Sequence, residues 1–250
     1  MTVNNQQFID QLKAFNEEKF SKDIYIPSLE RTVKFSTLTA KHQKDIIHSA
    51  LDNPILNLIF HDKVYGIIKE LCHEKDYIDT FTVYDKDAIL IQMRYYFISN
   101  EYKNKDFTHV VDFIKTMKLD LSPKLDDVDG FTVQYQIPNI KQERKILGEF
   151  KQNNSINMSS QSEEDIRNII SHAYVLEIMK HVSRAQLNDL GAVVDFNQHT
   201  FDENLEIVNL FGKKVCDKIH KFINDNRNSF EGMYKIDDDT KLEIDSTLFS

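Results

Sequence analysis

The chain has 250 residues, of which 41% are hydrophobic and 28% charged, a composition typical of a folded protein with one large or two small domains. Its net charge of −9, with lysines interleaved among acidic residues, argues against nonspecific nucleic-acid binding, for which a basic stripe is expected. No run approaches the roughly 18 apolar residues of a membrane span, and the N-terminus lacks the basic and apolar regions of a signal peptide. The two cysteines, Cys72 and Cys216, lie far apart in the chain, which favours a reducing compartment over a disulfide framework.

The first predicted element is an amphipathic helix over residues 5–20. Phe8, Leu12 and Phe15 recur at helical spacing, with Ile9 alongside them. This apolar face either docks on the chain's own domain or contacts a partner, and the spacing leaves both interpretations open.

A β-hairpin and a helix are predicted next. Residues 24–26 and 32–35 alternate apolar and polar side chains on either side of the turn sequence PSLER. Thr39 is then expected to cap a helix whose buried stripe begins at Ile46.

Residues 53–118 are predicted to be mostly helical. Asn53 and Pro54 are the residue types of an N-cap and a first helical position, and Asp85 is expected to cap the helix that follows. That helix contains AILIQMRYYFI, which is apolar nearly all round and therefore typical of a buried central helix. A further helix is expected over residues 106–118.

The second half of the chain begins after a turn-rich break, SPKLDDVDG, at residues 122–130. FTVQYQIP alternates strictly and predicts a strand that Pro138 ends. The sequence MYKIDDDTKLEI near the C-terminus predicts a second hairpin. Between about 203 and 226, apolar residues step by 3, 4, 4 and 3, which predicts a bundle or short coiled-coil seam made of Val208, Phe211, Val215, Ile219 and Phe222.

Together these elements predict an α+β fold that is mainly α with small β-hairpins. We expect a helical bundle-like body with an N-terminal and a C-terminal hairpin. Its parts are an amphipathic helix (1–22), a hairpin plus helical region (23–125), and a strand, helical pair and C-terminal hairpin (126–250), joined in one compact body.

The sequence contains no strong catalytic, phosphate-binding or metal-binding motif. The chain contains no Gly-rich phosphate loop, no nucleophile elbow and no HExxH pair. Cys216 and His220 lie one helical turn apart, but they supply only two of the four ligands of a structural zinc, and the fold would have to bring Cys72 and His73 to them. The acidic run before Gly130 fails as a calcium loop, because Leu125 and Gln136 occupy positions that require Asp and Glu. We therefore expect no catalytic residue, cofactor or metal.

Four stretches, in chain order, resemble a known protein family. They are IPSLERTVKFSTLT, FTVYDKDAILIQMRYYFIS, FTVQYQIP with the helix after it, and the closing LEIDSTLF. The first resembles the IPS-x-x-x-x-V-x-F-x-x-LT hairpin of the baseplate hub assembly proteins of contractile-tailed, T-even-type phages (T4-type baseplate proteins). The last resembles that family's I-x-I-D-x-x-L-F ending. Glu30 departs from the family pattern, where a Gly-type turn residue is expected.

The resemblance implies a non-enzymatic role in tail morphogenesis. Such proteins promote assembly of the baseplate hub, and some are thought to act as chaperones of the tape-measure protein. The implied partners are other phage tail proteins, either tape-measure or hub proteins, with no nucleic acid and no membrane. The implied location is the host cytoplasm during assembly or the virion baseplate, and homo-oligomerisation stays open.

Two alternatives accompany this hypothesis: a permanent structural subunit of the baseplate hub, and a small enzyme with an unrecognised site. The enzyme hypothesis predicts a polar pocket with convergent groups of shifted pKa. For the assembly hypothesis, the candidate contact residues are those of the two amphipathic segments: Phe8, Leu12, Phe15, Val208, Phe211, Val215 and Phe222. The alternative for both segments is packing inside the chain's own core, which the pattern of each residue taken singly favours.

Overall fold

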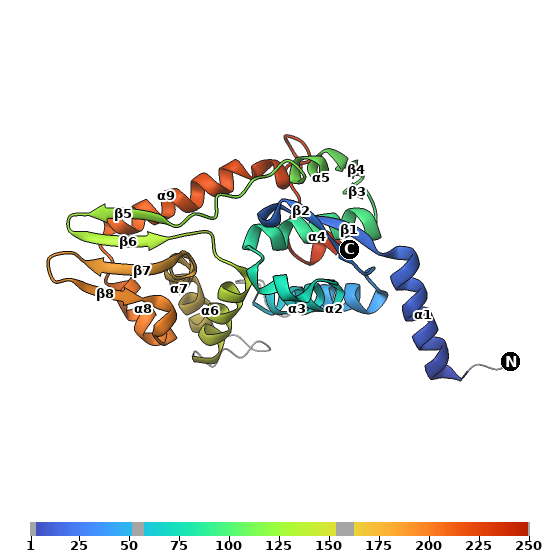
Figure 1. The fold of residues 1–250 in the computed structure, drawn as a ribbon, viewed down its shortest axis with the longest axis horizontal. Coiled ribbons are helices and arrows are strands. Elements are labelled where there is room, and N and C mark those ends of the chain that lie inside the picture. The colour runs from blue at the N-terminus through green and yellow to red at the C-terminus, as the bar shows by residue number, and fades with distance from the viewer. Residues whose placement is uncertain (1–3, 52–57, 154–162, 250) are drawn as a thin grey trace.

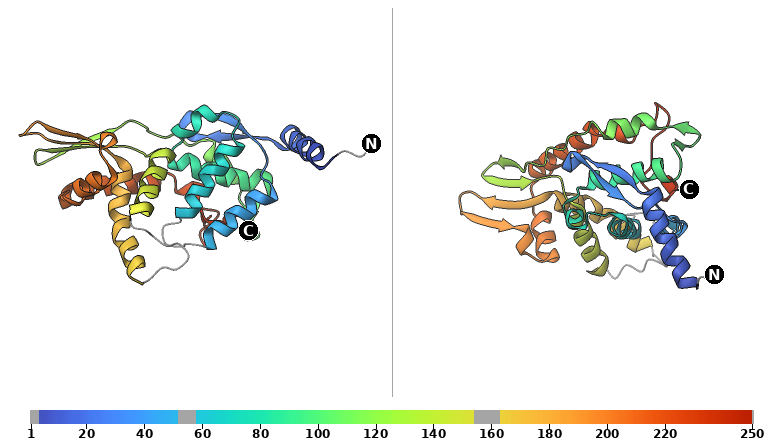
Figure 2. Two further views of the ribbon diagram at one scale, coloured as in Figure 1. Left: turned by 90° about the horizontal axis from the view of Figure 1, so that it is seen from below. Right: turned by 45° about the vertical axis from the view of Figure 1, so that its right-hand side comes forward.

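The computed structural model describes residues 4–51, 58–153 and 163–249 of the chain. Helices predominate, and the strands form small antiparallel sheets, so the predicted α+β class is confirmed (Figure 1). The buried apolar side chains gather in two core clusters, one around the N-terminal hairpin and one around a four-stranded sheet. Helix α1 (Asn5–Phe20) extends away from both (Figures 1 and 2).

The predicted N-terminal hairpin is confirmed. Strands β1 (Lys22–Ile26) and β2 (Arg31–Phe35) pair antiparallel and bury their alternate apolar side chains in the first core. A 3-10 turn, Pro27–Leu29, joins them and ends at Glu30, whose φ of 49° lies in the left-handed region. Glu30 therefore adopts a conformation that favours glycine.

The first core is built around helix α4 (Val83–Phe97), which is buried nearly all round, as its sequence predicts. Gln92 of α4 accepts a hydrogen bond from the backbone of Tyr25 at 2.9 Å and donates one back at 2.8 Å, which fixes the hairpin on this helix. The helices of this body besides α4 are α2 (Ala40–Leu51), α3 (Leu58–Leu71) and α5 (Thr108–Ile114). The predicted helix start at 53–54 lies outside the described residues.

The N-cap of α4 is Thr82, not Asp85. Thr82 Oγ1 accepts from the Asp85 backbone N–H at 3.1 Å, and the Asp85 carboxylate accepts from the Thr82 backbone N–H at 2.6 Å. This capping box satisfies two backbone donors. The prediction of Asp85 as the cap was wrong because it overlooked that an acid at the third helical position serves the cap three residues earlier.

The elements around the second core form the second body of the molecule. A four-stranded antiparallel sheet of order β5-β6-β7-β8 is its main feature. Its strands are β5 (Lys124–Val128), β6 (Phe131–Tyr135), β7 (Val182–Leu187) and β8 (Ala192–Asp195). Strand β6 confirms the predicted strand. The stretch before it, predicted as a break, is instead β5, and only Asp129 and Gly130 form the turn, with φ of 54° and 86°. Asp-Gly with both residues at positive φ is the signature of a tight hairpin turn.

Helices α6 (Ile140–Asn153), α7 (Glu163–His181), α8 (Phe201–Asn209) and α9 (Lys213–Ser229) complete the second body. The predicted seam over 203–226 is divided between α8 and α9, because the chain leaves helical geometry after Asn209 and restarts with Gly212 as N-cap. A continuous seam was thus wrong, although its residues do share one core.

The C-terminal segment returns to the first core. Met233, Leu242, Leu248 and Phe249 are buried there. The predicted C-terminal hairpin is reduced to one bridge, between Lys235 and Lys241, where the chain doubles back. Short strands β3 (Glu101–Tyr102) and β4 (Lys105–Asp106), which the sequence did not reveal, form another small hairpin.

Candidate functional site

Helix α1 is an apolar arm. Phe8, Leu12 and Phe15 are 60%, 47% and 50% exposed, and none of the helix's side chains is buried. Asn4 and Gln7 form a capping box that starts the helix, so local interactions shape it. Figures 1 and 2 show the helix projecting from the hairpin body.

An exposed ion pair links this arm to the body. His73 Nε2 lies 3.8 Å from Glu17 Oε1, an exposed pair that contributes little stability. The ring of Phe15 meets that of Phe20 edge-on, with centroids 5.7 Å apart. A helix of 16 residues that buries no apolar face on its own body gains little from tertiary packing, so a partner would be its natural cover.

The second set of candidate contact residues has the opposite environment. Val208 and Val215 are buried in the second core, which is the internal-packing alternative for the seam. Phe222 is half-buried and packs edge-on against Tyr135, with centroids 5.0 Å apart. Phe211 is also half-buried, but it remains accessible from a cleft.

That cleft, which we call the tip cleft, opens at the end of the sheet. It has a volume of about 600 Å³ and is lined mainly by apolar side chains of the β5–β8 sheet and of the α8–α9 connection. Phe131 and Phe211 in its lining pack edge-on, with centroids 5.3 Å apart. Leu210, 79% exposed, stands at its rim. The tip cleft and α1 are thus two apolar surfaces open to solvent.

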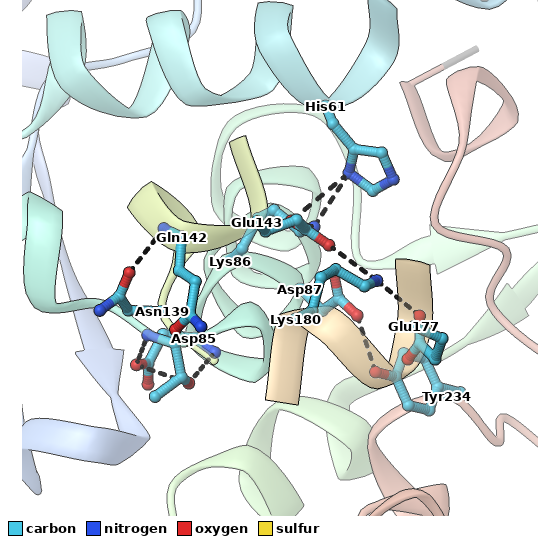
Figure 3. Close-up of polar contacts among 11 residues, drawn as sticks. His61, Asp85, Lys86, Asp87, Asn139, Gln142, Glu143, Glu177, Lys180 and Tyr234 are labelled. Carbon is cyan, nitrogen blue, oxygen red and sulfur yellow. Dashed lines mark hydrogen bonds and ion pairs between the residues drawn. The ribbon is translucent and has the colours of Figure 1, made fainter. Parts of the chain in front are cut away.

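Between the two cores lies a network of charged side chains, the charged junction (Figure 3). At its centre, Lys86 Nζ of α4 lies 2.6 Å from Glu143 Oε2 of α6, and both side chains are more than nine-tenths buried. Lys180 of α7 lies 3.7 Å from Glu143 and 2.6 Å from Glu177. The network therefore ties α4 of the first core to α6 and α7 of the second.

Two further contacts extend the charged junction. Arg227 of α9 lies 3.2 Å from Glu177, so α9 joins the same network. The Tyr234 hydroxyl donates to the Asp87 carboxylate at 2.8 Å, which holds the C-terminal segment against α4 (Figure 3). His61 of α3 lies 2.9 Å from Lys86 Nζ, so at least six separate stretches of the described chain meet here.

The electrostatics of the charged junction follow from burial and pairing. Burial raises the pKa of Glu143, but Lys86, His61 and Lys180 outweigh it and hold that pKa well below its usual range. Burial lowers the pKa of His61, reinforced by Lys86, and it lowers the pKa of His181 to about 4. Both histidines are therefore neutral at pH 7. Lys86 and Lys180 each face a carboxylate, so the buried charges are paired. We therefore interpret the network as a structural link between the two cores.

The metal candidates of the sequence do not come together. Cys72 belongs to the first core and Cys216 to the second. His220 stacks on Tyr174, with ring centroids 4.2 Å apart. Within the part of the chain that the structure describes, no group of three or more His, Cys, Asp or Glu side chains is placed to hold a metal ion.

Sequence reasoning missed both the tip cleft and the charged junction. One signal for the junction was present: Lys86 and Asp87 open a helix whose continuation is almost entirely apolar, so their charges required partners inside the fold. The partners Glu143 and Lys180 are more than 50 residues further along the chain, and no local pattern connects them.

Comparison with known proteins finds no matching family model, no similar curated protein and no similar solved structure. None of the described helices is long and apolar enough to cross a bilayer.

Proposed function

We propose that this chain is a non-enzymatic morphogenesis factor of a contractile phage tail, which promotes baseplate hub assembly by binding another tail protein through α1. The exposed apolar face of α1 is the observation that carries the proposal, because a projecting helix with Phe8, Leu12 and Phe15 in solvent is suited to binding another protein. The family resemblance of the sequence supports the choice of partner.

The expected partner is an amphipathic helix or an apolar groove. Helix-in-groove recognition uses side chains at i, i+3, i+4 and i+7, and positions 8, 12 and 15 of α1 follow that spacing. A tape-measure or hub protein that exposes such a helix before assembly fits this requirement. In this role α1 would shield the partner until the tail forms.

Co-expression tests the proposal. The chain would be produced with the tail proteins of its own phage and purified through a tag, and the complex would be weighed by light scattering. We expect a stable complex with a tape-measure or hub protein, and at least tenfold weaker binding for Phe8→Glu, which introduces a charge into the contact.

Leu125→Glu is the matched control. Leu125 is 68% exposed on β5, far from α1 in the chain, so the same substitution should leave the complex intact. A wild-type chain that ignores every tail protein, or a Phe8→Glu variant that binds as tightly as wild type, would overturn the proposal. Finding the chain in purified virions would favour the alternative of a permanent hub subunit over a transient factor.

A second candidate function is an enzyme or small-molecule binder at the charged junction. A cleft of about 750 Å³ opens onto Glu143, Lys180 and His181, so groups of shifted pKa converge there as that hypothesis requires. A thermal-shift screen of metabolites tests it. A ligand that raises Tm for wild type but not for Lys241→Ala, at the exposed side of the cleft, would favour it; no response to any compound would reject it.

A further inference from the structure

We propose that the tip cleft of one copy binds α1 of a second copy, so that the chain associates with itself head to tail. The inference goes beyond the proposed function, because it assigns the tip cleft an occupant and gives α1 a cover in the absence of any tail protein.

The tip cleft is apolar at its base and positive at its rim. Leu187, Ile207 and Leu210 line it, and the N-terminus of α9 closes one side. Gly212 caps that helix without a side-chain hydrogen bond, so the first N–H groups of α9 lack a side-chain acceptor at the cap.

Two lysines add to this positive end. Lys214 Nζ donates to Asp129 Oδ2 at 2.6 Å, whereas Lys213 has no ion-pair partner among the described residues. Lysines in the first turn also oppose the helix dipole. The rim of the tip cleft therefore favours an apolar ligand that carries a carboxylate.

Helix α1 has that composition. Phe15 and Phe20 form an edge-to-face pair near its end, and Glu18 follows Phe15 by three positions, so it lies beside the apolar face. Glu18 lies 4.0 Å from Lys19 in an exposed pair, which is weak enough to exchange for a contact with the rim. Aromatic side chains in a cleft of about 600 Å³, with a carboxylate at its positive rim, combine the two recognition elements that the cleft offers.

The two surfaces cannot meet within one molecule. Helix α1 and the tip of the β5–β8 sheet lie at opposite ends of the longest axis (Figure 1), and α1 continues almost directly into β1, which is held in the first core. The contact must therefore join different copies. Because the two surfaces differ, the interface is heterologous, and repetition yields a ring or a chain of copies.

Self-association would also protect α1. An exposed aromatic stripe risks nonspecific association, and occupancy by a second copy removes it until a tail protein competes. We expect one helix in one cleft to bury less than a standard interface of about 1,600 Å² and therefore to bind weakly and reversibly.

Sedimentation velocity of the purified full-length chain tests the proposal. We expect the mean mass to rise with concentration above the 29.4 kDa of one chain. Phe15→Glu, which damages the arm, and Leu210→Glu, which damages the cleft, should each reduce the mass to that of a monomer. Both positions are exposed, so circular dichroism should show both variants folded.

Mixing the two variants gives the decisive result. Phe15→Glu retains an intact cleft and Leu210→Glu an intact arm, so an equimolar mixture should form one contact and stop at a dimer of twice the chain mass. A charge swap, Lys213→Glu with Glu18→Lys, should restore association that either change alone weakens. The control Leu125→Glu should associate like wild type.

The opposing outcomes are equally defined. A wild-type chain that is monomeric at every concentration overturns the proposal. Association that survives Leu210→Glu but not Phe15→Glu also overturns it, because arms would then be pairing with arms. The result is independent of the proposed function, since Leu210→Glu should still bind a tail protein through its intact α1.

Discussion

Two segments of this chain have similar apolar periodicity and opposite environments. The stripe of α1 and the seam over residues 208–222 both repeat apolar side chains every three or four residues. In the structure the α1 stripe lies in solvent, whereas Val208, Val215 and Ile219 are buried. Periodicity therefore establishes that a helix has an apolar face but does not establish what covers it.

The cover of the seam is made of elements distant in sequence. Tyr135 of β6 packs on Phe222, and Phe131 packs on Phe211. The charged junction then links α6, α7 and α9 to one another through the pairs Glu143–Lys180 and Glu177–Arg227. The pair Lys86–Glu143 joins them to α4 of the first body. Helix α1 has neither a sheet against its face nor a buried ion pair, and this difference leaves its apolar face in solvent.

The largest effect should come from breaking the charged junction. Glu143→Gln leaves Lys86 buried without its carboxylate, whereas Lys180 keeps Glu177 at 2.6 Å. Loss of one partner of a buried pair costs about 3–5 kcal/mol of unfolding free energy. Urea denaturation at pH 7 measures it. Lys141, two residues before Glu143 in α6, forms an exposed ion pair with Asp79. Lys141→Gln should therefore change stability by less than about 0.5 kcal/mol. Equal losses would show that the junction does not fasten the cores.

Truncation of the two apolar faces tests the comparison directly. Ile219→Ala empties a fully buried position of the seam and should cost about 3 kcal/mol. Leu12→Ala, on α1, should cost less than about 0.5 kcal/mol, because its side chain is already half in solvent. The same urea titration measures both. A large loss for Leu12→Ala would mean that α1 packs on its own body.

Acid should lower the free energy of unfolding through His181. Burial lowers the pKa of His181 to about 4, against 6.5 in the unfolded chain. Between pH 6.5 and pH 4 the unfolded chain therefore binds a proton at His181 that the native chain does not bind. This contribution to stability is present above pH 6.5 and is lost as pH falls toward 4. Between pH 7 and pH 5 the loss from His181 should be about 2 kcal/mol.

Denaturation of the His181→Leu variant checks this attribution. The variant should show a shallower dependence of unfolding free energy on pH over the same interval, while its stability at pH 7 serves as its own reference. The carboxylates of the junction contribute little to the pH dependence between pH 7 and pH 5. The pKa of Glu143 in the unfolded chain is about 4.5, so the stability that this carboxylate contributes is lost mainly below pH 4.5. An unchanged slope would transfer the effect to another group.

Local sequence signals predicted the elements whose determinants lie within a few residues. Alternation of apolar and polar residues predicted the hairpin of β1 and β2 and the strand β6. Apolar residues on nearly all sides predicted the buried helix α4. The Asp129–Gly130 turn is also a local signal, because Asp-Gly is typical of a two-residue hairpin turn. A break was predicted over residues 122–130 instead, so strand β5 was not predicted.

What the sequence could not show is long-range pairing. Strand β6 pairs with β7 about 50 residues later, and Lys86 pairs with Glu143 across 57 residues. Such contacts depend on the global fold and leave no periodic pattern. The tip cleft inherits this difficulty, since its lining combines strands and helices from several parts of the chain.

The smallest effect concerns the hairpin that carries α1. Glu30 has a φ of 49°, a conformation that costs a non-glycine residue roughly 1–2 kcal/mol. Glu30→Gly removes this cost but adds freedom to the unfolded chain, so the net gain should be about 0.5 kcal/mol. The ion pair lost with Lys118, at 3.9 Å and exposed, contributes little. A gain in urea stability with unchanged partner binding would separate the stability of the hairpin from the activity of its arm, whereas a loss would show that the Glu30 side chain stabilises the turn.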